Sequence, residues 1–231
     1  MNGSSGFAPE SRLDPQLGGH FVTRWWWVRH APVVDAHLLR LSGQSDVAAD
    51  LSDRAAFQAL APHLPTGAVW VTSPLQRTTQ TAQALWEAGA VRAEPIVEPA
   101  FAEQAFGDWT GCTWAELGEK EDARPFWDAP ATIAPPTAKT GRPAESFADQ
   151  CARVAARIEG LTAEHAGRDI IAVAHAGSIR AAVALALALT PAQALGLEVK
   201  NLGLTRLDHI AAAPRPARGG NWRVVGLNQI C

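Results

Sequence analysis

The sequence predicts a three-layer α/β fold, in which a mainly parallel, doubly wound sheet carries helices on both faces. Strand-like segments rich in Val, Ile, Trp and Ala alternate along the chain with longer segments of helical periodicity. The first of the strand-like segments contains a continuous apolar run, Trp25 to Val28, which is typical of a central parallel strand that is buried on both faces. With 231 residues, of which 47% are hydrophobic and 19% charged, the chain is large enough to form one such domain.

The predicted elements follow one another in a regular order. Strands are expected at 24–29, 68–73, 94–97, 169–175, 202–209 and 222–228. Helices are expected at 52–63, 74–89, 144–166 and 176–189. In the first strand Trp25 and Trp27 would face one helix layer, and Trp26 and Val28 the other. We interpret the three tryptophans as a buried central strand and not as a membrane-interface anchor, because no amphipathic helix flanks them.

Residues 111–143 interrupt the alternation of strands and helices. They begin with a short predicted helix and continue with a stretch rich in Pro, Thr and Ala. Trp114, Phe126 and Trp127 provide this stretch with apolar surface for docking. We interpret it as an insertion at the edge of the sheet, with two alternatives left open: a lid that selects the substrate, or a structural loop.

Composition and charge exclude several classes of protein. The formal net charge of −3 provides no basic field for nucleic acid or anionic lipid, so neither is expected as a partner. The apolar segment 180–190 is shorter than the roughly 18 residues of a membrane span. Three cysteines without a CxxC pair indicate neither a disulfide framework nor a zinc site, and they favour a reducing cytoplasm. Residues 1–23 resemble no secretory signal and are expected to be a flexible leader to a single domain at 24–231.

Four segments carry groups suited to binding and transferring a phosphoryl group. Arg29 and His30 end the first predicted strand, and His175 ends the fourth. Open α/β sheets bind ligands at the carboxyl ends of their strands, so both histidines are expected in one crevice. Arg77 lies on the first turn of a helix, where the helix N-terminus favours anions. Glu103 precedes a turn bounded by glycines.

Together these segments resemble the histidine phosphatase superfamily, also called the phosphoglycerate mutase-like family. The resemblance is carried by Arg29-His30-Ala31, GQSDVAADLSDRAAFQA at 43–59, SPLQRTTQTA at 73–82, FGDWTG after Glu103, and HAGSIR from His175. It implies that His30 is the nucleophile and forms a phosphohistidine. It also implies that Glu103 protonates the leaving oxygen and later activates water. Arg29, Arg77 and His175 would hold the phosphoryl oxygens.

This assignment is chemically consistent without a metal ion or cofactor, and none is expected. A neutral imidazole is a competent nucleophile near pH 7. Phosphoryl transfer needs mainly positioning and charge neutralisation, which two guanidinium groups and a second histidine supply. Glu103 would act as a general acid if burial against Phe101, Phe106 or Trp109 raised its pKa, and we expect this direction.

The sequence departs from the family pattern around the phosphate pocket. Ala31 replaces the usual glycine, and Ala36 stands where relatives often carry an asparagine, so one phosphate donor is missing. His37 and Gln44 are expected to compensate as substrate-binding residues. Ala176, which follows the second histidine, is also expected at the substrate.

Within the family, hydrolysis is favoured over isomerisation. The resembling mutases carry basic and tyrosine contacts after the catalytic glutamate, whereas this chain has no tyrosine and continues with Gln104-Ala105-Phe106. The chain looks most like the branch with alpha-ribazole phosphatase and broad-specificity phosphatases. We therefore expect a hydrolase of a small phosphorylated metabolite. A phosphoglycerate mutase and a phosphate-ligand binding protein weakened at Ala31 and Ala36 are the alternatives, and homodimerisation is left open.

Overall fold

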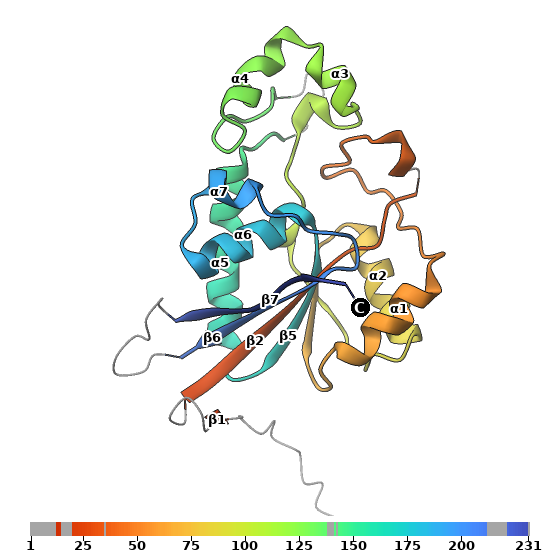
Figure 1. Ribbon diagram of the computed structural model, residues 1–231, viewed down its shortest axis with the longest axis vertical. Coiled ribbons are helices and arrows are strands. Elements are labelled where there is room, and N and C mark those ends of the chain that lie inside the picture. The colour runs from red at the N-terminus through yellow and green to blue at the C-terminus, as the bar shows by residue number, and fades with distance from the viewer. Residues whose placement is uncertain are drawn as a thin grey trace, which may run out of the picture.

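The computed structural model describes residues 13–14, 20–34, 36–137, 141, 143–211 and 221–230, without the side chains of 13, 14, 20, 37 and 122. A twisted sheet lies between two helical layers (Figure 1). Its strands are β1 (Leu13–Asp14), β2 (His20–Arg29), β3 (Val69–Thr72), β4 (Ile96–Val97), β5 (Asp169–Ala174), β6 (Leu204–Ile210) and β7 (Trp222–Gln229). The order is β4-β3-β5-β2-β6-β7, and β1 pairs with β2. Strands β4, β3, β5 and β2 are parallel, and β6 and β7 complete one edge as antiparallel strands.

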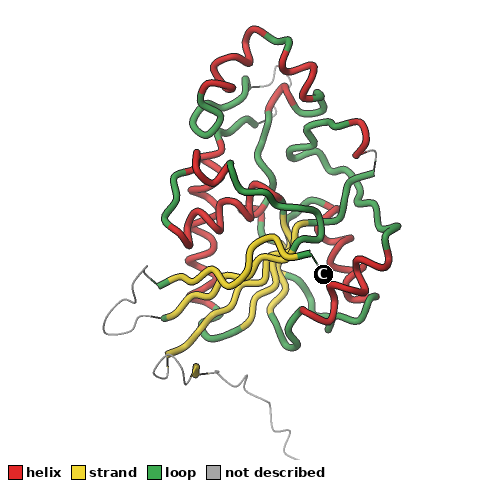
Figure 2. Tube along the Cα trace, viewed as in Figure 1, coloured by secondary structure: helices red, strands yellow, loops and turns green. Residues whose placement is uncertain are grey.

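The helices cover both faces of this sheet, as predicted. They are α1 (Arg54–Leu60), α2 (Gln76–Glu87), α3 (Trp114–Gly118), α4 (Arg124–Asp128), α5 (Phe147–Glu164), α6 (Ala176–Leu187) and α7 (Pro191–Leu195). Helices α5 and α6 lie on one side of the sheet and α1 and α2 on the other (Figure 2). The fold class is confirmed, whereas α4 and α7, each of five residues, were not predicted. In the described part of the chain, every helix is too short or too polar to cross a membrane.

The tryptophan run forms the middle of β2, between β5 and β6, as predicted. Trp25 and Trp27 are fully buried and stack with their ring centroids 5.2 Å apart against the layer of α5 and α6. The indole of Trp25 also donates a hydrogen bond to Thr162 of α5 at 3.0 Å. Val28 and Trp26 pack in the opposite apolar cluster. The run therefore lies in a central strand of the sheet, and this strand fixes the position of Arg29 and His30 at its carboxyl end.

One boundary expected from the sequence is wrong. Residues 20–23 were assigned to the leader, but they begin β2, where Val22 and Thr23 pair with Ile210 and His209 of β6. Val22 and Thr23 are also buried, so the strand gains apolar contacts by starting earlier. Apart from Leu13 and Asp14, the rest of the expected leader lies outside the described residues.

The segment 111–143 forms a small subassembly of α3, a 3-10 helix (Glu121–Ala123) and α4 (top of Figure 1). Its buried residues Leu117, Ala123 and Phe126 form a separate apolar cluster with Leu41 and Trp109, which lie outside the segment. The aromatic rings of Trp109 and Phe126 meet edge to face at 5.0 Å. The insertion is thus held to the domain by its own core and contributes a wall to the cavity described next.

Candidate active site

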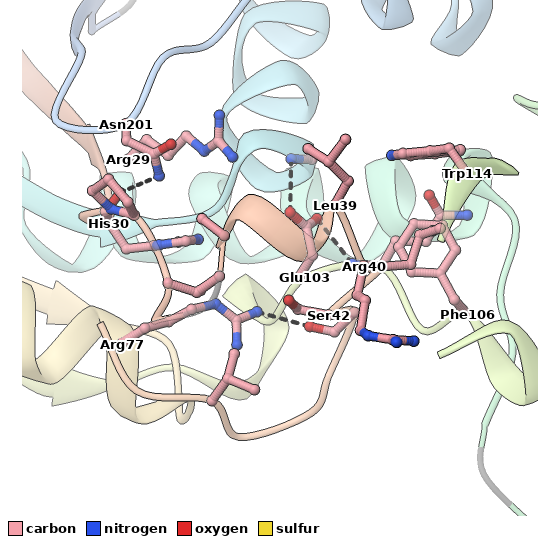
Figure 3. A pocket seen from close by; sticks show the side chains of 18 of the residues that line it. Arg29, His30, Leu39, Arg40, Ser42, Arg77, Glu103, Phe106, Trp114 and Asn201 are labelled. Atoms are coloured by element: carbon pink, nitrogen blue, oxygen red, sulfur yellow. Dashed lines mark hydrogen bonds between the residues drawn. The ribbon is translucent and has the colours of Figure 1, made fainter. Parts of the chain in front are cut away.

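A cavity of about 700 Å³ lies at the carboxyl end of the parallel strands and is lined on its far side by the insertion. Arg29, His30, Arg77 and Glu103 line it together, although they come from three separate segments. Figure 3 shows Arg29, His30 and Arg77 on one side of the cavity, with Glu103 facing them. The ring of His175 lies behind His30, at a centroid distance of 5.1 Å. The structure therefore brings together the five residues predicted to be catalytic.

His30 is held in one orientation by backbone contacts. Its Nδ1 lies 2.6 Å from the carbonyl oxygen of Ala31, which can only accept, so Nδ1 carries the proton and the lone pair is on Nε2. The side-chain amide of Asn201 donates to the carbonyl of His30 at 2.8 Å. Burial keeps the pKa of His30 well below its usual value, and the charge that His175 would carry if protonated and the charge of Arg77 act in the same direction. His30 is thus a neutral imidazole with an unprotonated Nε2.

His175 occupies the N-cap position of α6 and is fully buried. Its Nε2 lies 2.7 Å from the hydroxyl of Ser73, at the end of β3. Burial, and then the charges of Arg77 and Arg29, place the pKa of His175 well below the usual value, so this ring is also neutral. Its Nδ1 is buried without a hydrogen-bond partner among the described residues.

The two predicted arginines are anchored by part of each guanidinium group. Arg77 donates from Nη1 to Ser45 O at 2.8 Å and from Nη2 to Gly43 O at 2.7 Å. Arg29 donates from Nη1 to Val199 O at 2.5 Å. The Nε groups of both are buried and have no partner among the described residues. Buried donors are nearly always paired, so these two groups and Nδ1 of His175 are consistent with a site for an anion.

Glu103 accepts three hydrogen bonds at the opposite side of the cavity. The backbone N–H of Gln104 donates at 2.9 Å, the amide of Gln150 at 3.1 Å and the backbone N–H of Gly177 at 3.4 Å. Burial acts to raise the pKa of Glu103, but these hydrogen bonds and the charge of Arg77 outweigh it and hold the pKa below its ordinary value. The raised pKa expected from the sequence is therefore wrong for the free site.

Gly177 is required for this position of the carboxylate. A Cβ at residue 177 would lie 2.2 Å from Oε1 of Glu103 and 2.4 Å from Oε1 of Gln150. Only a residue without a side chain lets Glu103 approach the N-terminus of α6, where backbone N–H groups favour negative charge.

The remaining predicted residues lie at the edge of the cavity or outside it. Gln44 donates to the carbonyl of Glu103 at 3.0 Å and lines a neighbouring pocket, so it holds the backbone of Glu103 and does not reach the cavity. Ala176 packs in the main apolar core, while the next residue, Gly177, lines the cavity. His37 lies in a 3-10 helix (Ala36–Leu38), and its side chain is outside the described residues.

The structure adds two site residues that sequence reasoning did not identify. Arg180, on the second turn of α6, lines the cavity and donates from Nε to Leu197 O at 2.8 Å. Asn201 lines it from the loop before β6. Arg180 ends the HAGSIR segment, so its position one turn into a helix that starts at the site was a usable signal. Asn201 lies outside every motif and is positioned only by the tertiary fold. Within the described ranges, no cluster of three or more His, Cys, Asp or Glu is arranged to hold a metal ion.

Comparison with known proteins gives a consistent result. The model of the histidine phosphatase superfamily (branch 1) matches residues 25–221. A bifunctional protein of Mycobacterium tuberculosis is 31% identical over 118 residues, which cover 51% of this chain but only 30% of that protein. The chain thus matches less than a third of this curated relative's length.

Solved structures match over nearly the whole domain. A mycobacterial glucosyl-3-phosphoglycerate phosphatase is similar with a TM-score of 0.71 and 28% identity, over 90% of this chain and 99% of that one. A candidate alpha-ribazole-5′-P phosphatase of Escherichia coli has a TM-score of 0.74 at 18% identity, over 90% and 96% of the two chains. The second similarity concerns the fold alone.

Proposed function

The chain belongs to the histidine phosphatase superfamily, and from this premise we propose that it hydrolyses phosphate monoesters through a phosphohistidine, without a metal ion. The observation that carries the proposal is the arrangement around His30. His30, a neutral imidazole protonated on Nδ1, lies together with Arg29, Arg77 and His175, whose Nε, Nε and Nδ1 atoms are buried without partners among the described residues. A phosphoryl group would supply acceptors to all three donors while His30 attacks the phosphorus.

The proposed reaction has two displacement steps. Nε2 of His30 forms a bond to phosphorus as the ester P–O bond breaks, and Glu103 gives its proton to the departing oxygen. Water then attacks the phosphohistidine, Glu103 takes one of its protons, and phosphate leaves as the P–N bond breaks. Arg29, Arg77 and Arg180 stabilise the charge on the phosphoryl oxygens in both transition states.

Hydrolysis is favoured over the two alternatives. The mycobacterial relative at 28% identity is named as a phosphatase, which supports hydrolysis over mutase activity. The weakened binding protein is disfavoured because Arg180 supplies a further cation in the cavity that Ala36 also lines. We therefore propose a small phosphorylated metabolite as substrate, a cytoplasmic location and, at the level of branch, a resemblance to the alpha-ribazole phosphatases.

Phosphate release from p-nitrophenyl phosphate in the presence of EDTA tests this function. We expect turnover in the wild type and its loss in His30→Ala, with His63→Ala as the matched control because His63 is exposed and remote from the cavity. Alkaline quenching during turnover should trap a base-stable, acid-labile phosphate on the wild type and on His63→Ala, but not on His30→Ala. Activity that survives in His30→Ala, or that disappears with EDTA, would contradict the mechanism.

A further inference from the structure

We propose that the cavity selects phosphate monoesters whose leaving group is large and apolar, such as an aryl group or a long alkyl chain, over esters of polyhydroxylated alcohols. This inference rests on the proposed function and specifies the substrate class for the same site. Three observations support it: the apolar lining of the part of the cavity farther from His30, the exposure of the side chains there, and the left-handed backbone of Leu39.

The cavity is divided into a charged end and an apolar end. The charged end is formed by Arg29, His30 and Arg77. Beyond Glu103 lie Leu39, Phe106 and Trp114, which Figure 3 shows on the side away from His30. A ligand whose phosphate contacts the arginines must therefore extend its leaving group past Glu103 into apolar surroundings.

Besides Phe106, two segments supply this apolar wall, and most of their side chains are exposed. Leu38 and Leu39 come from the loop after β2, and Trp114, Phe126 and Trp127 come from the insertion. Leu39 is 68% exposed, Trp114 51% and Trp127 42%. The rings of Trp114 and Trp127 lie 5.7 Å apart, so they present one continuous aromatic surface. Large apolar side chains gathered around a cavity mark a binding surface, because a ligand removes them from water.

The backbone of Leu39 supports the same conclusion. Its φ of 50° lies in the left-handed region, which is unfavourable for a residue with a branched side chain. The strain holds a mostly exposed leucine at the cavity, although glycine or asparagine would fit this backbone better. Strained residues of this kind concentrate at ligand contacts.

Polar side chains that line the cavity beside this wall already bond within the protein. The amide of Gln104 donates to Glu145 O at 2.9 Å. Arg40 donates to Gly111 O at 2.6 Å. A sugar or glycerol would lose hydrogen bonds to water here and regain few from the described residues, whereas an apolar group loses none.

A series of straight-chain alkyl phosphates, from ethyl to octyl, tests the proposal. Their leaving groups have nearly equal basicity, so differences in kcat/KM report contacts of the chain. We expect kcat/KM to rise by about threefold per added methylene, which is roughly 700-fold over the six methylenes from ethyl to octyl phosphate. Glucose 6-phosphate and glycerol 3-phosphate should remain close to ethyl phosphate.

Two variants connect the preference to the wall. Trp114→Ala combined with Trp127→Ala should lower the octyl-to-ethyl ratio by at least about tenfold, whereas Phe21→Ala, an exposed aromatic remote from the cavity, should leave it unchanged. Leu39→Asn should lower the ratio without lowering the melting temperature, because asparagine tolerates the left-handed backbone. Leu187→Asn, at an exposed leucine outside the cavity, is its control.

The outcomes separate this proposal from the function on which it depends. Release from alkyl phosphates that is independent of chain length, or faster release from the sugar phosphates, would overturn the apolar preference while leaving the phosphatase in place. Release from no ester at all, p-nitrophenyl phosphate included, would overturn both.

Discussion

Glu103 must carry a proton when the leaving oxygen departs, yet its hydrogen bonds hold its pKa below the ordinary value. A bound phosphate dianion opposes this effect, since a nearby negative charge raises the pKa of a carboxyl group. His30 has the opposite requirement, because only the neutral ring is a nucleophile, and its pKa lies well below the usual value. His30 therefore stays neutral on the acid side of neutrality, where Glu103 gains its proton.

We predict that the preference for alkyl over aryl phosphates depends on pH. As the pH falls from about 8 to about 6, the ratio of kcat/KM for an alkyl ester to that for p-nitrophenyl phosphate should rise, because only the alkyl leaving group needs a proton from Glu103. In Glu103→Gln the ratio should be lower and flat across this range. A ratio that is independent of pH in the wild type would assign the acid to another group.

A second residue-scale prediction concerns Ser73, a positioning residue that acts through His175. If Ser73 donates to Nε2, the proton of His175 is kept on Nδ1, a buried atom without a hydrogen-bond partner among the described residues. Ser73→Ala should reduce kcat by about 10- to 100-fold with a smaller change in KM. Because an imidazolium carries protons on both nitrogens, the deficit should shrink as the pH falls. If kcat of Ser73→Ala were reduced by the same factor at every pH, Ser73 would have a structural role alone.

At the scale of single residues, the sequence predicts which side chains line the site but not the direction of the pKa shift of Glu103. Arg29, His30 and His175 end strands or begin helices, and such ends meet at one edge of a parallel sheet. The pKa of Glu103 depends instead on Gln150 and Gly177, which are distant in sequence and reach the carboxylate only in the folded chain. The direction of this pKa shift could not be predicted from residue types, because burial raises the pKa of Glu103 whereas hydrogen bonds lower it.

At the scale of elements, the two helices that were missed are short, although the equally short α3 was predicted at the start of the insertion. Helices α5 and α6 have 18 and 12 residues, long enough for an apolar repeat to be recognised. Helices α4 and α7 have five residues each and begin with prolines at Pro125 and Pro191, where caps and local packing, not periodicity, define them. The sequence likewise could not show that the insertion forms a wall of the cavity, because this depends on where the insertion packs in the folded chain.

The insertion should respond to mutation independently of the main domain, because it has a separate core. Leu117 of α3 and Leu161 of α5 are both fully buried leucines, but they lie in different apolar clusters. Truncating a buried leucine to alanine costs about 2 to 5 kcal/mol. We predict that Leu117→Ala increases amide hydrogen exchange in 112–131 and has little effect on exchange in α5 and α6. Leu161→Ala should lower the global melting temperature instead, and an equal global loss in both variants would contradict this division.

At the scale of the whole molecule, the domain encloses two neutral histidines among arginines, and this arrangement lowers the stability of the folded state at low pH. Burial, followed by neighbouring positive charge, lowers the pKa values of His30 and His175 in the folded state. Below about pH 6.5 the unfolded chain therefore binds more protons than the folded one. Stability is fully present above that pH and is lost as the pH falls towards the folded-state pKa values, by roughly 1.4 kcal/mol per pH unit for each histidine.

We predict that inorganic phosphate reduces this loss, because a bound anion satisfies the unpaired donors and favours protonation of both rings in the folded state. The melting temperature should fall more steeply between about pH 7 and pH 5 without phosphate than with it. His175→Asn should flatten the phosphate-free curve, whereas His63→Asn, at an exposed position, should reproduce the wild type. Carboxylates contribute to the same curve, but they are common to all three proteins, so the difference between the variants isolates the buried histidine. If phosphate shifted the curves by an equal amount at every pH, the anion would be bound without electrostatic contact with the histidines, and the geometry proposed for catalysis would have to be rejected.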